Sequence, residues 1–269
     1  MLRPSGVITL LTDFGWEGPF AASMKGVALS INPSARVVDI THSVPRHDVE
    51  AAAFILWSTY RYFPEGTVHV AVVDPGVGTA RRALAVRSRR FFFVGPDNGV
   101  LMMAAEDDAP FEAREVSNPS FMLSEVSRTF HGRDVFAPAA AKLSLGFSFE
   151  EVGGVVKDPV RLSRPSYRVE DGWLVGEVVY VDSFGNLALS IPGRALASLA
   201  RLGEACEVEA AGRRVEARFV EAYGSVGPGE LLLVEDSFGL VELAVNRGSA
   251  AEGLRLRRGD VVKVRPKPP

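Results

Sequence analysis

Apolar positions in residues 1–160 follow two alternating patterns. Short apolar runs rich in β-branched residues, typical of buried strands, alternate with longer segments whose apolar residues recur at helical spacing. Strands connected through helices pair in parallel with right-handed crossovers. We therefore expect an N-terminal α/β layered domain with a mostly parallel sheet over residues 1–160. The pattern predicts strands over 6–14, 35–41, 67–74, 82–88 and 90–95, and helices over 20–32, 47–63 and 134–146.

Two of the predicted helices carry start signals. Asp48 precedes the apolar face of the helix over 47–63 and is expected to be its N-cap. Asp134 can cap the helix over 134–146. That start keeps Pro138 within the first turn, where its missing N–H leaves no intrahelical hydrogen bond unmade.

The pattern changes after residue 160. Residues 161–172 are polar and contain Pro and Gly, which is typical of a linker. Residues 173–269 consist of short alternating runs separated by Gly-containing turns, with hardly any helical period. We expect a smaller C-terminal all-β domain there, either a barrel or a sandwich.

Composition and charge narrow the possible partners. Of the 269 residues, 47% are apolar and 23% charged, close to the average of soluble globular proteins. A net charge of -3 gives no general attraction to nucleic acid or anionic membrane. No signal-peptide pattern is evident, and no segment approaches the roughly 18 apolar residues that cross a bilayer. With a single cysteine, Cys206, which excludes an intramolecular disulfide, we expect a cytoplasmic protein.

Four polar signals follow predicted strands or precede a predicted helix in the first domain. Asp13 follows the first strand, Asp74 a later one, and Asp97 and Asn98 another, while His131 precedes a helix. In open α/β sheets, ligands bind at the carboxyl ends of the strands, where loops converge and helix N-termini point inward. The shared placement of these residues predicts a ligand site at that edge of the sheet.

Each residue also has a simpler structural interpretation. Asp13 and Asp97 adjoin Gly or Pro, so either carboxylate could simply bond backbone N–H groups within a turn. His42, His47 and His69 are expected to be structural or surface histidines, because an isolated histidine usually is. No residue of this set is assigned a function by itself.

His131 has the stronger physical case. It precedes Gly132, where no side chain blocks a small ligand, at a helix N-terminus that favours negative charge. Arg81 follows Asp74 by seven residues across a "PGVGT" turn, a spacing at which a tight turn brings the two side chains together. These three side chains could form an acid, base and cation triad that orients and deprotonates a water molecule.

Seven short motifs occur in one order along the chain: "TDFG", "MKG", "DPGVGTxRR", "PDNG", "TFHGRD", "DSFGN" and "NxGSA". Together they resemble the S-adenosyl-L-methionine hydrolases, also called hydroxide adenosyltransferases, which are related to the bacterial fluorinase and chlorinase. The resemblance spans nearly the whole chain. It implies that water or hydroxide attacks the ribose C5′ of S-adenosylmethionine and releases adenosine and L-methionine. It also implies a homotrimer whose sites lie between subunits, with no metal or redox cofactor.

The resemblance implies roles for residues in the first domain. The family triad of Asp, Arg and His matches Asp74, Arg81 and His131, whereas the halogenases lack the histidine. Asp13 resembles the carboxylate that holds both ribose hydroxyls, and Asn98 lies in a substrate-binding motif. Gly132 stands where the fluorinase has its halide-binding serine. His47 stands where it has a tryptophan beside the ribose, and both departures weaken fluoride chemistry.

Further substrate contacts are implied in the second domain. Asp182 and Asn186 resemble the groups that bind the methionine ammonium and the adenine edge. Ser237 matches a contact to the methionine carboxylate, although the next residue, Phe238, replaces a fluorinase arginine. Aromatic residues that could stack on adenine are Phe184 and Tyr223.

Three alternatives remain open at this stage. A metal-dependent phosphatase would use Asp13 and carboxylates of neighbouring loops to hold a divalent cation. A non-catalytic protein that binds adenosine or S-adenosylmethionine would use the triad as a binding network. A C5′ halogenase is disfavoured because Asp74 and His131 occur together.

Overall fold

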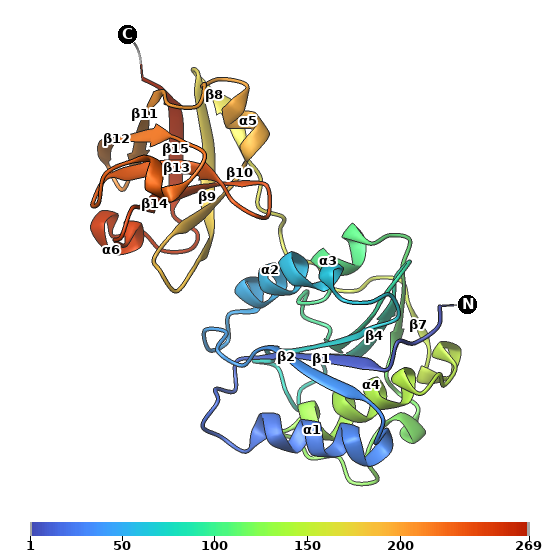
Figure 1. Ribbon diagram of the computed structural model, residues 1–269. Helices are drawn as coiled ribbons and strands as arrows, with labels where there is room; N and C mark the ends of the chain where they lie inside the picture. Colours follow the sequence, from blue (N-terminus) through green and yellow to red (C-terminus); the bar gives the residue numbers. More distant parts are fainter. Residues whose placement is uncertain (1, 268–269) are drawn as a thin grey trace. The chain divides into compact units, whose positions relative to one another are not determined.

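The computed structural model describes residues 2–267 and divides into two compact units between Ser163 and Arg164. Figure 1 shows an α/β unit formed by the first part of the chain and a β unit formed by the second. Each unit has its own hydrophobic core. No helix within residues 2–267 is both long and apolar enough to span a membrane.

The first unit is a seven-stranded sheet with helices on both faces. Ile8 and Leu10 pack in the apolar cluster that includes helices α1 and α4, whereas Leu11 packs with α2 and α3 on the opposite face. The strand order is β2-β1-β3-β5-β4-β6-β7. The strands are β1 (Val7–Thr12), β2 (Arg36–Thr41), β3 (Val68–Val72), β4 (Ala83–Arg87), β5 (Phe92–Pro96), β6 (Glu112–Glu115) and β7 (Val155–Val156), and the helices are α1 (Phe20–Ile31), α2 (Val49–Thr59), α3 (Met102–Asp107) and α4 (Ala137–Ser144).

Only half of this sheet is parallel. Strands β2, β1, β3 and β5 pair in parallel, as the alternation of strands and helices predicts. Strands β4, β6 and β7 continue the sheet with antiparallel pairings. The connection between β4 and β5 is only the turn over 88–91, which is too short for a crossover. The α/β class is therefore confirmed, with a mixed sheet in place of the mostly parallel one expected.

The two predicted helix caps have different outcomes. The side chain of Asp48 accepts a hydrogen bond from the Ala51 N–H at 2.9 Å, which confirms it as the cap of α2. The Asp134 cap is wrong, because a π-helical turn, η3 (Gly132–Phe136), precedes α4 and contains that residue. Asp134 is fully buried there, and its carboxylate accepts the Ser127 N–H at 2.8 Å. It therefore closes the preceding loop.

The second unit is a closed barrel of seven strands. Its order is β10-β14-β13-β12-β11-β15-β9, and pairing of β9 with β10 closes the ring, so the expected all-β domain is a barrel. Strand β8 extends the sheet beside β9, although its residues fall in the predicted linker. The strands are β8 (Arg168–Glu170), β9 (Trp173–Val181), β10 (Leu187–Pro192), β11 (Ala205–Ala210), β12 (Arg213–Phe219), β13 (Leu231–Glu235), β14 (Leu240–Val245) and β15 (Val261–Pro266), with short helices α5 (Gly193–Ala197) and α6 (Ala250–Leu254).

Candidate active site

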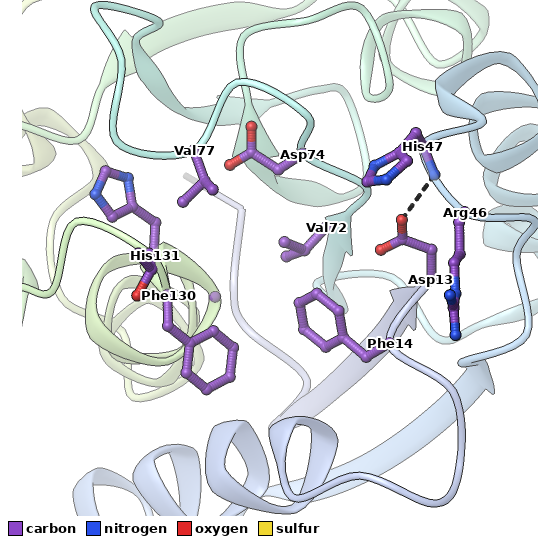
Figure 2. Close-up of a pocket in the computed structure, with 11 residues that line it drawn as sticks. Asp13, Phe14, Arg46, His47, Val72, Asp74, Val77, Phe130 and His131 are labelled. Carbon is purple, nitrogen blue, oxygen red and sulfur yellow. Dashed lines mark hydrogen bonds between the residues drawn. The ribbon is translucent and has the colours of Figure 1, made fainter.

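A cavity opens in the first unit at the carboxyl ends of β1 and β3 (Figure 2). Its wall combines acidic, basic and aromatic side chains from four loops. Such a mixture of apolar surface with a few convergent polar groups is typical of small-molecule sites. The lining residues are Asp13, Phe14, Arg46, His47, Val72, Asp74, Val77, Thr129, Phe130, His131 and Gly132.

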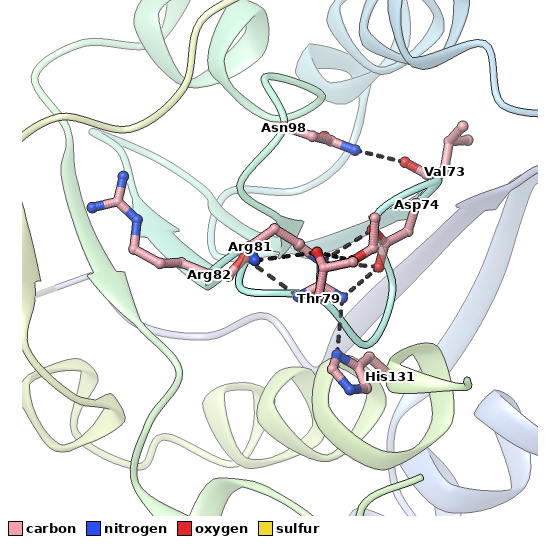
Figure 3. A network of polar contacts seen from close by, with 8 residues as sticks. Val73, Asp74, Thr79, Arg81, Arg82, Asn98 and His131 are labelled. Carbon is pink, nitrogen blue, oxygen red and sulfur yellow. Dashed lines mark hydrogen bonds and ion pairs between the residues drawn. The ribbon is translucent and has the colours of Figure 1, made fainter. Parts of the chain in front are cut away.

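Arg81 joins the two other residues of the predicted triad (Figure 3). Its Nε lies 3.0 Å from Asp74 Oδ1 and 3.1 Å from Oδ2, and its Nη2 donates a further hydrogen bond to Oδ2. The same Nη2 lies 2.9 Å from His131 Nδ1. The side chains of Arg81 and Asp74 are only 11% and 6% exposed. The structure thus brings Asp74, Arg81 and His131 into one connected group.

The contact with Arg81 fixes the state of His131. A guanidinium has donors and no acceptor, so Nδ1 of His131 must accept this hydrogen bond. The neutral imidazole then carries its proton on Nε2. Burial lowers the pKa of His131, and the positive charge of Arg81 lowers it further, against smaller opposing effects of Asp74 and Asp134. His131 is therefore neutral near pH 7, with Nε2 as a donor.

The turn after Asp74 explains how residues seven apart meet. The Thr79 N–H and hydroxyl both bond to the carbonyl of Gly76, which closes the turn before Arg81. Gly78 has a φ of 76°, and a Cβ there would lie 2.1 Å from the Arg128 carbonyl oxygen. Only glycine allows the turn to approach the loop that leads to His131 this closely.

Gly132 lies in a tightly packed position. A Cβ at this position would lie 3.0 Å from the Phe130 ring and 3.1 Å from the Met24 sulfur. Gly132 also lines the cavity, so no side chain at this position blocks the approach of a small ligand, as expected. Its lack of a side chain therefore seats the turn that carries His131 against α1.

Asp13 lines the same cavity and is held by a backbone donor. Its Oδ2 accepts the His47 N–H at 2.9 Å, and His47 adopts a positive φ of 66° (Figure 2). Both side chains face the cavity with Arg46. As an isolated histidine His47 was expected to be structural or at the surface, whereas the family resemblance put it at the position of a tryptophan beside the ribose. Sequence reasoning missed Arg46, which lies in the same loop between β2 and α2.

The polar residues of the "PDNG" motif bond to neighbouring segments of the chain and do not line the cavity. Asn98 donates to the Val73 carbonyl at 2.8 Å and accepts the Val100 N–H at 3.2 Å, and it is outside the set that lines the cavity (Figure 3). Asp97 pairs with Arg82, with 2.7 Å between Oδ2 and Nε. These contacts brace the loop beside Asp74. They indicate that Asn98 supports the cavity wall.

In the second unit, the "DSFGN" segment forms a self-bonded turn between β9 and β10. Asp182 Oδ1 accepts the N–H groups of Phe184 and Asn186 at 2.8 and 2.9 Å. Its Oδ2 accepts the Asn186 side-chain amide at 3.0 Å. Phe184 at the tip is 75% exposed. The turn thus combines an exposed aromatic ring with a carboxylate whose position is fixed by its hydrogen bonds.

A second polar group of this unit centres on Glu242, which sequence reasoning missed. The Tyr223 hydroxyl donates to Glu242 Oε1 at 2.7 Å. Burial raises the pKa of Glu242, and the nearby charges of Asp182 and Asp236 raise it further. Asp236 Oδ1 accepts two backbone N–H groups of its own turn, which leaves Ser237 exposed. Val241 and Leu243 of β14 pack in the barrel core, so the alternation of the strand puts Glu242 on the opposite face with Ala244, and no sequence signal singled it out.

The other histidines are structural, as expected. His42 and His69 are fully buried and bond to Thr12 and Thr9, respectively. Within residues 2–267, no three His, Cys, Asp or Glu side chains form a group that could hold a metal ion.

Comparison with known proteins gives matches over both units. Models of the S-adenosylmethionine hydroxide adenosyltransferase N-terminal and C-terminal domains match residues 8–153 and 176–263. The (R)-S-adenosyl-L-methionine hydrolase of Salinispora tropica is 42% identical over 98% of this chain and 99% of its own length. A fluorinase of an Actinoplanes species is 32% identical over 69% of this chain and 71% of its own.

A solved structure has the same fold. The crystal structure of an uncharacterized conserved protein from Thermotoga maritima superposes with a TM-score of 0.92 at 38% sequence identity. The match covers 96% of this chain and 99% of that one.

Proposed function

This chain belongs to the S-adenosylmethionine hydroxide adenosyltransferase family, and on that premise we propose that it hydrolyses S-adenosyl-L-methionine to adenosine and L-methionine. The observation that carries the proposal is the position of Arg81, which bonds Asp74 and His131 at once beside the cavity. A relative with this activity in its name matches the chain from end to end. No metal or redox cofactor is needed for the reaction.

The reaction is a displacement at the ribose C5′. The oxygen of a water molecule forms a bond to C5′ while the bond from C5′ to sulfur breaks. The electron pair of that bond neutralises the sulfonium as methionine leaves. The positive charge of the substrate is therefore dispersed in the transition state and is neutralised when the water proton passes to the carboxylate, which a poorly solvated cavity wall favours. The low exposure of Asp74 in the cavity wall, and of Arg81 bonded to it, limits solvent there.

The role of each triad residue follows from its hydrogen bonds. The Nε2–H of His131 orients the water by donating to its oxygen, because Nδ1 already accepts from Arg81. Asp74 accepts the water proton through its remaining lone pairs. Arg81 holds both partners in place and stabilises the developing hydroxide.

Substrate binding draws on the first unit of one subunit and the barrel of a neighbouring subunit. Asp13 holds the two ribose hydroxyls, and Gly132 leaves room beside the reacting carbon. In the barrel, Asp182 attracts the methionine ammonium in a field strengthened by Glu242 and Asp236. The barrel's remaining substrate contacts are Asn186 at the adenine edge, Phe184 and Tyr223 on the adenine face, and Ser237 at the carboxylate. The protein acts as a cytoplasmic homotrimer with sites at subunit interfaces.

Isotope labelling tests this proposal. Chelator-treated protein is incubated with S-adenosylmethionine in ¹⁸O water, and the nucleosides are analysed by mass spectrometry. Adenosine with ¹⁸O at its 5′ oxygen and free methionine are expected. Unchanged substrate would contradict the proposal. Turnover that returns only after a divalent metal is added would favour a metal-dependent hydrolase.

A further inference from the structure

The turn that carries Asp13 into the cavity is held from behind by a buried hydroxyl. Thr12, the last residue of β1, is fully buried, and its Oγ1 accepts the Phe14 N–H at 3.2 Å. Asp13 and Phe14 both line the cavity. The Thr12 hydroxyl therefore fixes the backbone that aims the Asp13 carboxylate.

His42 lies on the far side of this hydroxyl. Its Nδ1 is 2.9 Å from Thr12 Oγ1, and its Nε2 is 3.0 Å from Asp39 Oδ1. An ionised carboxylate only accepts, so the neutral imidazole carries its proton on Nε2 and accepts the Thr12 proton at Nδ1. The Thr12 oxygen keeps a lone pair for the Phe14 N–H. One tautomer therefore satisfies every group.

Lys25 of the "MKG" motif completes the connection from helix α1. Its Nζ lies 2.5 Å from Asp39 Oδ2, the carboxylate oxygen that His42 does not use. Each oxygen of the Asp39 carboxylate therefore has its own partner, Lys25 or His42. Three elements, α1, β2 and β1, are thus joined to the turn beside the cavity.

A strand irregularity makes this arrangement possible. Leu10 pairs with Asp39, but the next residue, Leu11, pairs with Thr41, so β2 contains one extra residue. On a regular strand, residues three apart face opposite sides. The extra residue redirects the chain so that Asp39 and His42 meet, as bulges commonly do near functional sites.

The order of Thr12, His42 and Asp39 matches that of a nucleophile, base and orienting acid. Both Thr12 and His42 are fully buried, so this hydroxyl cannot reach a bound molecule. The Gly15 N–H also bonds to the His42 carbonyl at 2.8 Å, which ties the same turn a second time. The geometry therefore assigns a positioning role.

We propose that Lys25, Asp39, His42 and Thr12 are positioning residues that hold Asp13 in the geometry required to bind a ribose diol. The inference rests on the proposed function, because it takes Asp13 as the group that binds the ribose. Affinity for adenosine should depend on this connection. The group centred on Arg81 shares none of its hydrogen bonds.

Strand β1 itself provides a matched control. Thr9 is also fully buried, and its Oγ1 lies 2.8 Å from Nδ1 of another buried histidine, His69. That histidine packs among the rings of Tyr60, Phe63 and Phe93, none of which lines the cavity. Thr9→Val thus removes the same kind of bond from the same strand without touching the site.

The test is the dissociation constant of adenosine, measured by calorimetry on the full chain. Thr12→Val should weaken binding about tenfold, since it leaves buried polar groups unpaired, and should raise KM more than it lowers kcat. Thr12→Ser keeps the hydroxyl and should restore the affinity. Thr9→Val should leave the affinity unchanged even where the melting temperature falls. Unchanged binding in Thr12→Val, or an equal loss in Thr9→Val, would overturn the inference.

Two substitutions of His42 sharpen the test. Asn places its amide oxygen near the position of Nδ1 and can accept from Thr12, whereas Gln places its amide near Nε2 and bonds Asp39 instead. His42→Asn should therefore bind adenosine more tightly than His42→Gln, and the reverse order would contradict the inference. Wild-type protein that binds adenosine but leaves S-adenosylmethionine intact would overturn the proposed activity alone. Failure to bind adenosine would overturn both.

Discussion

Each unit contains a cluster of ionisable groups, and the central residue is a cation in the α/β unit and a carboxylate in the barrel. In the α/β unit a cation, Arg81, lies between a carboxylate and an imidazole and donates to both. In the barrel a carboxylate, Glu242, bonds to a phenol, and the charges that act on it are two further carboxylates. The first arrangement fixes proton positions. The second holds a negative potential that a cationic ligand would relieve.

Under the proposed function, the two groups act on different parts of the substrate. Groups that orient and deprotonate water must be held rigidly, because small displacements cost large factors in rate. Groups that attract a cation act over longer distances and tolerate looser placement. Substitutions around Arg81 should therefore change kcat most, whereas those around Glu242 should change binding or stability.

Removal of Arg81 should have the largest effect. Arg81→Met leaves Asp74 and His131 without their shared donor, and kcat should fall about 10²- to 10³-fold, as for other preorganised charge-stabilising donors. Steady-state kinetics of adenosine release measures the change. Arg87→Met is the matched control, since Arg87 pairs with Glu112 and Glu150 outside the set that lines the cavity. An equal loss of kcat in the control variant would show that Arg81 has no special role in the reaction.

His131 should rank next. His131→Asn keeps an acceptor for Arg81 but loses the Nε2 donor, so kcat should fall about 100-fold, as for the loss of one preorganised donor. His131→Gln, which can place a donor near Nε2, should retain more activity. The affinity for adenosine, measured by calorimetry, should be nearly unchanged in both. A parallel loss of affinity would show that His131 only packs.

The pH dependence of kcat/KM should report the protonation of His131. The pKa of His131 is lowered by burial and by Arg81, so the imidazole stays neutral until the pH falls below the usual histidine range. Protonation then removes the acceptor for Arg81. The value of kcat/KM should be flat at neutral pH and fall about tenfold per pH unit below that lowered pKa. A fall that begins at or above the usual histidine range would contradict this assignment.

The stability of the fold in acid should depend on the buried His69. Burial lowers the pKa of His69 to about 3, so the unfolded chain binds more protons than the folded one between that value and the ordinary pKa. The folded state should therefore lose stability as the pH falls from about 6.5 toward 3. Denaturant unfolding at several pH values measures the slope, and His69→Phe should reduce it.

The smallest catalytic effect is expected at Tyr223. Tyr223→Phe keeps the ring and leaves Glu242 without its donor, so unfolding free energy should fall by about 1 kcal/mol while kcat stays unchanged. Tyr223→Ala also removes the stacking surface and should weaken adenosine binding about tenfold. Chemical unfolding and calorimetry separate the two contributions. A large kcat change in Tyr223→Phe would place the phenol in the chemistry.

The sequence by itself determined the alternation of strands and helices, the α2 cap at Asp48, and the placement of Asp13, Asp74 and His131 at cavity-forming loops. These features depend on periodicity and on neighbours a few residues away, which a single sequence displays directly.

Tertiary structure alone decided the choice of distant partners. It placed Asp134 inside a helical turn, gave Asn98 a supporting position, made β4, β6 and β7 antiparallel, and revealed Glu242 beneath Tyr223. It also joined Lys25 to Thr12 through Asp39 of β2 and His42, which follows that strand. A side chain's partner is set by which buried groups remain unpaired once the chain has packed, and sequence spacing carries no record of that.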